Sequence, residues 1–242
     1  MKKTYEKNEL TFTLIWIGIY VISQSIANSI NILGIEYSVN AVVNIVLTVL
    51  LFRFINKNGL LEKYGLYKTS IPASKFLWYI PLFILATHNL WNGFAFNLPF
   101  AGSICYIIYM LGVGFVEEIL FRGFLFKALE KDNVKTAIIV SSVTFGLGHL
   151  VNLINSNGMD LVTNLCQVVG AIALGFLFVT IFYRGGSLLP CILTHAAIDV
   201  ASCFANEAGL TPERRILFSL SRAIIVIAYT FILLKTLPKT QK

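Results

Sequence analysis

Apolar side chains run along this chain in long blocks that short polar segments separate. A helix that crosses the bilayer core needs about 20 mainly apolar residues. By that measure we predict about eight transmembrane helices, at 10–33, 38–55, 76–95, 103–126, 136–153, 160–183, 187–206 and 216–235. The loops between them are too short to hold a soluble domain. The pattern therefore predicts an all-α polytopic membrane protein, with residues 1–242 as a single integral membrane domain.

The composition agrees with a membrane protein and argues against one class of partner. Hydrophobic residues make up 57% of the chain and charged residues only 13%, whereas soluble domains carry about 25% charged residues. The net charge of +7 raises the question of nucleic-acid binding. However, the basic residues lie in short loops, and the sequence has no basic stripe with interleaved aromatic residues. We therefore expect a lipid bilayer as the partner and exclude nucleic acid.

The basic residues also predict the orientation of the chain. They concentrate before the first span, in the second, fourth and sixth loops, and in the C-terminal tail. Short loops that are rich in Lys and Arg stay on the cytoplasmic side of a membrane. Only the seventh loop, with Arg214 and Arg215, departs from this pattern. We therefore expect both termini to be cytoplasmic.

Several ionisable side chains interrupt the predicted spans. Such groups are costly in the hydrocarbon core and normally face a protein interior or a water-filled cavity. Those that we single out are Glu117, Glu118, Arg122, His149, His195 and Asp199. Two others receive a structural interpretation. We expect His88 to be hydrogen-bonded near the outer face, and Arg222 to snorkel outward or to pair with a buried acid.

Spacing along a helix indicates which of these side chains share a face. Residues four apart lie on the same side, so Glu118 is expected to pair with Arg122. His195 and Asp199 have the same spacing. Glu117 lies about 100° round the helix from Glu118, which leaves its carboxylate available for chemistry.

Three polar groups lie at similar depth although they belong to different predicted helices. With a rise of about 1.5 Å per residue, Glu117 lies about 15 Å from the cytoplasmic end of its span, His195 about 16 Å and His149 about 21 Å. Phe145 precedes His149 by four residues and shares its face. A common site requires such agreement in depth. We therefore expect the fourth, fifth and seventh spans to bring these groups together.

Two routes to amide hydrolysis are open to these residues. In one, a Zn²⁺ ion lowers the pKa of a bound water. The ligands would come from His149, His195, Glu117 and Asp199. In the other route no metal is needed: Glu117 and His149 act as general base, and His195 with Asp199 stabilises the oxyanion. A set of carboxylates and imidazoles can also relay protons in a transporter.

The ordered motifs resemble those of a known family. They are EExxxR at Glu117, Glu118 and Arg122, FxxxH at Phe145 and His149, and HxxxD at His195 and Asp199. Each motif has its own predicted helix. This order is similar to that of the CAAX-protease and bacteriocin-processing family of intramembrane endopeptidases, over roughly residues 100–205.

The resemblance implies an intramembrane endopeptidase whose catalytic core is residues 100–205. The residues implied as catalytic are Glu117, His149, His195 and Asp199. Those implied as supporting are Glu118, Arg122 and Phe145. Cleavage would take place near the cytoplasmic side of a membrane cavity. Members that process prenylated proteins typically carry Asn where this chain has Asp199, which favours metal binding and a different substrate.

The expected substrate is therefore a peptide or a membrane-associated protein, in a bacterial plasma membrane. Bacterial members of the family are associated with bacteriocin self-immunity, peptide processing or turnover of membrane proteins. Two other functions stay open: a non-catalytic immunity or interaction protein with the same fold, and a proton-coupled transporter. The sequence defines neither the substrate nor the oligomeric state.

Overall fold

The computed structural model describes residues 1–30, 34–155 and 161–239. Every regular element in these ranges is a helix, and they contain no strand. The predicted all-α fold is confirmed. The long helices are α2 (Glu9–Ser29), α3 (Ser38–Lys57), α5 (Phe100–Glu118), α7 (Val134–Gly148), α9 (Leu161–Gly185) and α11 (Pro212–Thr236). The shorter elements are α1 (Lys2–Lys7), η1 (Ala73–Tyr79), α4 (Ile80–Ala86), η2 (His88–Leu90), η3 (Ile119–Phe126), α6 (Lys127–Leu129), α8 (Val151–Asn155) and α10 (Leu189–Ser202).

Helix is present in all eight predicted spans, but two of the helices are short. Among the described residues, six helices are long and apolar enough to cross a membrane. The third predicted span is reduced because Leu77, Trp78 and Tyr79 adopt positive φ angles of 50°, 52° and 60°, which break the helix before α4. The seventh is α10, which has 14 residues.

The loop between η2 and α5, both of which pack against α10, bonds to the chain that directly follows α10. The backbone N–H of Ala95 donates to the carbonyl of Phe204 at 2.9 Å. The amide of Asn97 donates to the carbonyl of Cys203 at 3.1 Å. These bonds satisfy carbonyl groups that follow the last helical turn and would otherwise lack partners. The seventh span is therefore completed by non-helical chain that is packed against protein.

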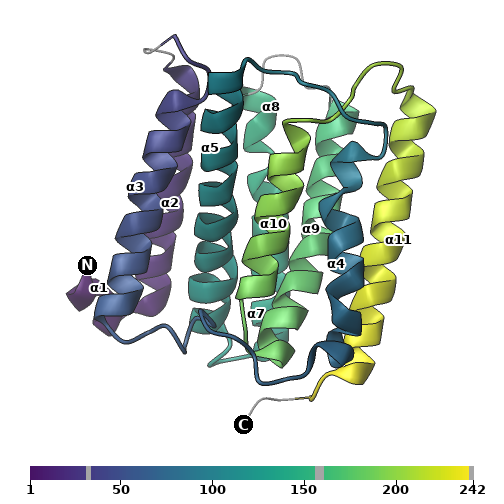
Figure 1. Ribbon diagram of the computed structural model, residues 1–242. Helices are drawn as coiled ribbons and strands as arrows, with labels where there is room; N and C mark the ends of the chain where they lie inside the picture. Colours follow the sequence, from purple (N-terminus) through teal and green to yellow (C-terminus); the bar gives the residue numbers. More distant parts are fainter. Residues whose placement is uncertain (31–33, 156–160, 240–242) are drawn as a thin grey trace.

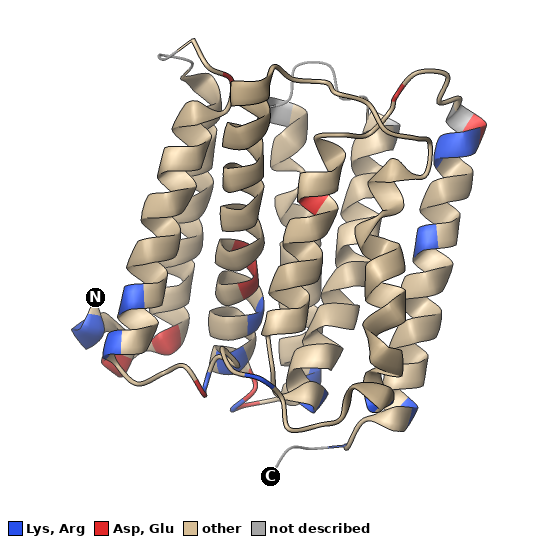
Figure 2. Cartoon of the chain, in the orientation of Figure 1, with Lys and Arg blue, Asp and Glu red and all other residues tan. Residues whose placement is uncertain are grey.

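The helices form one bundle in which both termini lie at the same end (Figure 1). Most Lys and Arg residues lie at this end too, as Figure 2 shows. α10 packs against α5 on one side and α4 on the other, while α9 packs against both α7 and α11. α7 also packs against η3, which continues α5, so the three helices with the predicted motifs, α5, α7 and α10, are held in one part of the bundle.

The fourth span changes its backbone geometry directly after the two glutamates. α5 ends at Glu118, and η3 is a π-helix over Ile119–Phe126 in which every residue is buried. π-helical turns are rare and occur frequently at functional sites. The sequence predicted the extent of this span but not its wider turn.

Gly114 allows α5 and α10 to approach closely next to the polar residues. A Cβ atom at this position would lie 2.7 Å from the backbone nitrogen of Ala196. Backbone atoms of a packed helix have little room to move, so a side chain here would push the two helices apart. Gly114 therefore brings His195 of α10 to the carboxylates of α5.

We expect Gly114→Ala to destabilise the bundle by about 1–3 kcal/mol, because overpacking forces shifts of backbone. Gly18→Ala on α2 is the matched control, since no atom lies within 4 Å of its Cβ position. Thermal unfolding of the purified protein in detergent measures both. Equal unfolding temperatures for the two variants would contradict this account of the contact between α5 and α10.

Candidate active site

Glu118 is the centre of a buried polar cluster. Its side chain is 0% exposed, and the same oxygen, Oε1, accepts two hydrogen bonds. Arg122 donates from Nη1 at 2.9 Å, and Nδ1 of His195 lies at 2.8 Å. A guanidinium only donates, so Oε1 of Glu118 accepts from Arg122, and Nδ1 of His195 is the donor to the same oxygen.

Arg122 is held by aromatic rings as well as by Glu118. Its guanidinium carbon lies 3.9 Å from the ring centroid of Phe145 and 5.7 Å from that of Phe178. A cation above an aromatic face is attracted to the ring, most strongly where both are removed from water. The ring of Phe145 also meets that of His195 edge-on at 5.6 Å. Phe145 therefore contacts both the cation and the imidazole.

Glu117 points away from this pair and towards a cavity. Its side chain is 15% exposed. Tyr20 of α2 donates its hydroxyl to Oε1 at 2.6 Å, and Nε2 of His195 lies 3.7 Å from Oε2. The sequence interpretation that the two glutamates have different partners fits Tyr20 and Arg122, but both glutamates also face His195, each at a different ring nitrogen. It missed Tyr20, which belongs to no motif and lies 97 residues away in the sequence.

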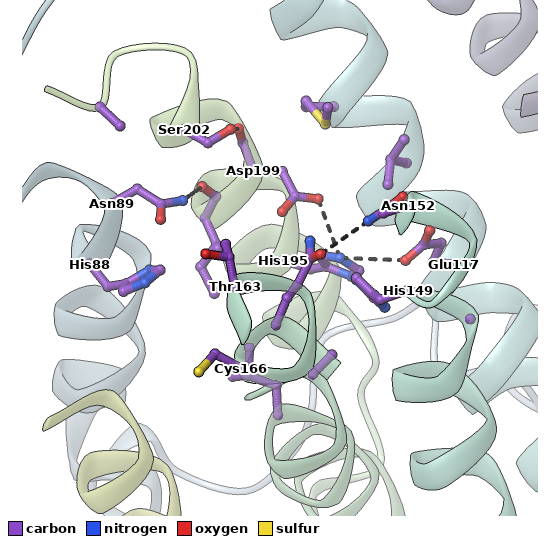
Figure 3. A pocket seen from close by; sticks show the side chains of 18 of the residues that line it. His88, Asn89, Glu117, His149, Asn152, Thr163, Cys166, His195, Asp199 and Ser202 are labelled. Carbon is purple, nitrogen blue, oxygen red and sulfur yellow. Dashed lines mark hydrogen bonds and ion pairs between the residues drawn. The ribbon is translucent and has the colours of Figure 1, made fainter. Parts of the chain in front are cut away.

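His195 lies between the carboxylates, as Figure 3 shows. Its Nε2 is 3.3 Å from Oδ2 of Asp199, one turn further along α10. Nδ1 is engaged by Glu118 on the other side of the ring. With acceptors at both nitrogens, the geometry favours a ring that carries hydrogens on both. The spacing of His195 and Asp199 therefore gives the contact that the sequence predicted.

His149 lines the same cavity but stands apart from the carboxylates. It caps the C-terminal end of α7, and its Nδ1 lies 3.2 Å from the carbonyl oxygen of Phe145. A carbonyl only accepts, so Nδ1 is the donor in this contact and Nε2 is the nitrogen left for other partners. Within the described part of the chain, no hydrogen bond or ion pair joins His149 to Glu117. The two share a chamber and make no direct pair.

The cavity has a volume of about 530 Å³ and is bounded by all four residues that the sequence assigned to catalysis. Its exposed lining residues include Asn28, near the C-terminal end of α2, and Glu207, in the chain that follows α10. The C-terminal end of α2 and the chain that follows α10 lie at the end of the bundle opposite the termini (Figure 1). From η3, whose residues are all buried, Phe121 alone lines the cavity. The chamber therefore opens away from the termini.

His88 and Arg222 also line this cavity, which the sequence did not predict. Nη1 of Arg222 lies 3.3 Å from Nε2 of His88. The predicted hydrogen-bonded role of His88 fits this contact. The expected buried acid beside Arg222 is not present among the described residues.

The predicted zinc ligands do not form a close set. In the described ranges, no group of three or more His, Cys, Asp or Glu side chains is arranged to hold a metal ion. Both nitrogens of His195 are already directed at carboxylates, and His149 makes no contact with Glu117. The side chains as arranged do not fit a zinc ion, and zinc binding stays a prediction from the sequence.

A comparison with protein families supports the motif-based resemblance. Residues 99–201 match the family model described as Rce1-like, type II CAAX prenyl endopeptidase Rce1-like. The matched segment, which is less than half of the chain, contains every residue that the sequence assigned to the site. Over this segment the match agrees with the family predicted from the motifs, and it supports protease activity in general terms. No curated protein and no solved structure matches the chain.

We expect the substitutions Glu118→Leu and Arg122→Leu to be strongly coupled. Either one alone leaves a buried charge without its partner and should cost about 3–5 kcal/mol, whereas replacement of both removes both charges and should cost less than the sum. Thermal unfolding of the two single variants and the double variant measures the coupling. Additive losses would contradict a buried ion pair.

Proposed function

We propose that this protein is an intramembrane endopeptidase that hydrolyses a peptide bond in a peptide or a membrane-associated protein. The observation that carries the proposal is the convergence of Glu117, His195 and Asp199 on one chamber inside a bundle of membrane-spanning helices. Burial of this many ionisable groups in a membrane is costly and marks functional sites. The family match supports the same class of activity.

Glu117 is the proposed general base. Its Oε1 is occupied by the hydroxyl of Tyr20, so Oε2 is the oxygen that takes a proton from water. Removal of this proton allows the water oxygen to attack the carbonyl carbon of the peptide bond. Nε2 of His149 is a second acceptor on the same chamber, since its Nδ1 is directed at a backbone carbonyl.

His195 is the proposed oxyanion donor. Attack by water turns the carbonyl oxygen into an oxyanion, which a positioned N–H stabilises. Glu118 holds Nδ1 of His195, and Nε2 lies at the chamber beside Asp199, so its hydrogen turns from Asp199 to the oxyanion when the oxyanion forms. Asp199 orients this nitrogen at 3.3 Å. Collapse of the intermediate breaks the C–N bond, and the proton held by Glu117 passes to the departing amine.

The proposed mechanism uses only side chains of this protein, and no step requires zinc. A resident zinc ion would supply an activated water, with His149, His195, Glu117 and Asp199 as the predicted ligands. In the arrangement described above, His195 is engaged at both nitrogens. That engagement favours the glutamate-type mechanism over the metallo-type.

The proposed orientation places both termini on the cytoplasmic side of a bacterial plasma membrane, with the basic loops. The mouth of the chamber then faces the opposite side of the membrane. This departs from the cytoplasmic access that the family resemblance implies. The substrates that reach such a mouth are secreted peptides and the outer segments of membrane proteins.

We expect Glu117→Gln to lower the cleavage rate by about 10²–10⁴-fold, the typical contribution of a general base. The amide retains an oxygen that accepts from Tyr20 but cannot take a proton from water. Peptides from cells with the wild-type and variant proteins, at equal abundance, are compared by mass spectrometry. The expected result is loss of a specific product and accumulation of its uncut precursor.

Glu130→Gln is the matched control for this experiment. Glu130 pairs with Lys127 at 2.8 Å outside the chamber, so its loss should leave the products unchanged. Identical peptide profiles for wild type and Glu117→Gln, with any deletion phenotype rescued by Glu117→Gln, would refute the peptidase proposal. The non-catalytic interaction protein would then be the better account.

The direction of the chamber mouth is tested with Cys166, a native cysteine in its wall. In a chain whose other cysteines are replaced, a membrane-impermeant thiol reagent should label Cys166 in intact cells. Ser70→Cys, in a Cys166→Ala chain, is the control at the end of the bundle with the termini and should be labelled only after permeabilisation. Labelling of Cys166 only in permeabilised cells would reverse the proposed access.

A further inference from the structure

Arg222 is a partly buried cation in the chamber wall, and the described residues give it no acidic partner. It lies on α11, and Nη1 is 3.3 Å from Nε2 of His88. The other arginine in the chamber lining, Arg215, pairs with Glu207 at 2.8 Å. In the described ranges, no carboxylate forms an ion pair with Arg222. Its charge therefore faces the chamber without compensation.

The surroundings of Arg222 are shaped to hold a guanidinium. Gly170 of α9 leaves the space that the group fills, because a Cβ atom there would overlap Nη2. Neutral His88 accepts one of the five N–H groups that a guanidinium carries. The other ring nitrogen of His88, Nδ1, is buried and has no hydrogen-bond partner. Two basic side chains and a glycine from three elements thus converge on one spot.

A charged side chain inside a membrane protein is costly unless a partner or a function compensates it. A guanidinium presents its N–H groups in a fixed fork that matches the two oxygens of a carboxylate. The chamber itself is polarised. Glu117 and Asp199 lie on the wall formed by α5 and α10, whereas Arg222 lies on α11. A bound peptide with an anionic group would therefore direct that group to Arg222 and its apolar part towards Glu117.

We infer that Arg222, together with His88, forms a second binding site in the chamber that takes a carboxylate of the bound peptide. This inference rests on the proposed peptidase function and adds a determinant of substrate choice to it. The carboxylate is either the C-terminal group of the peptide or an Asp or Glu side chain. In both cases the bound carboxylate fixes the position of the peptide relative to Glu117. Arg222 therefore determines which peptide bond lies next to Glu117.

The test is a binding measurement that does not depend on cleavage. The probes are dansyl-labelled apolar pentapeptides in three forms: with a free C-terminal carboxylate, with a C-terminal amide, and with the amide plus one Asp side chain. Dissociation constants are measured by fluorescence anisotropy in lipid nanodiscs, with Glu117→Gln as the parent protein. Failure of the peptidase proposal would leave this measurement unaffected.

The parent should bind at least one carboxylate peptide more tightly than the amide peptide, and the form preferred identifies the source of the carboxylate. Arg222→Met should abolish this preference, with a loss of about 10–100-fold for the carboxylate peptide, as expected for a hydrogen bond to a charged group. Binding of the amide peptide should not change. The matched control is Arg214→Met on the same helix, whose side chain is exposed and lies outside the chamber lining.

Three results would overturn the inference. The first is equal binding of all three peptides by the parent. The second is equal displacement of the carboxylate peptide by inorganic phosphate, which would indicate a phosphate site. The third is a large fall in the thermal unfolding temperature of Arg222→Met, because removal of an uncompensated charge should leave stability unchanged or raise it. Gly170→Ala, which crowds the guanidinium and keeps its charge, should weaken carboxylate binding as well.

Discussion

The shared Oε1 atom of Glu118 is the interaction on which the rest of the site depends. It accepts from Arg122 on its own span and engages Nδ1 of His195 on α10, and all three side chains are almost completely buried. A buried ion pair contributes little net stability but becomes very costly when one partner is lost. With Glu118 held by Arg122, its contact with His195 fixes where α10 sits relative to α5. As a consequence, His195 has one orientation, with Nε2 towards Glu117.

The other features of the site follow from this anchor. Gly114 lets the helices come close enough for the contact, and Phe145 covers the guanidinium and meets the imidazole. Tyr20 holds one oxygen of Glu117, so the two carboxylates keep separate tasks. The chamber beside them is lined by polar side chains towards the end opposite the termini. A reactive set is thus held in a fixed arrangement with access from one direction.

Much of this arrangement could be predicted from the sequence because it is local. Apolar blocks gave the positions of the helices, and the spacing of four residues gave the contacts of Glu118 with Arg122 and of His195 with Asp199. Contacts between distant elements could not be predicted in this way. Tyr20 reaches Glu117, and Arg222 reaches His88, only because of how whole helices pack. The π-helix after Glu118 depends on backbone geometry that no sequence pattern specifies.

The central claim is that side chains of this chain alone activate water inside a membrane bundle to hydrolyse a peptide bond. The most direct measurement is cleavage of an identified precursor by the purified protein in lipid nanodiscs, in H₂¹⁸O and with a zinc chelator present. Hydrolysis adds one solvent oxygen to the new carboxyl group. If Glu117 and His195 act without a metal ion, the product carries one ¹⁸O and forms at an unchanged rate. Two results would contradict a metal-free hydrolysis. The first is that no product forms until zinc is added back, and the second is that the product lacks ¹⁸O.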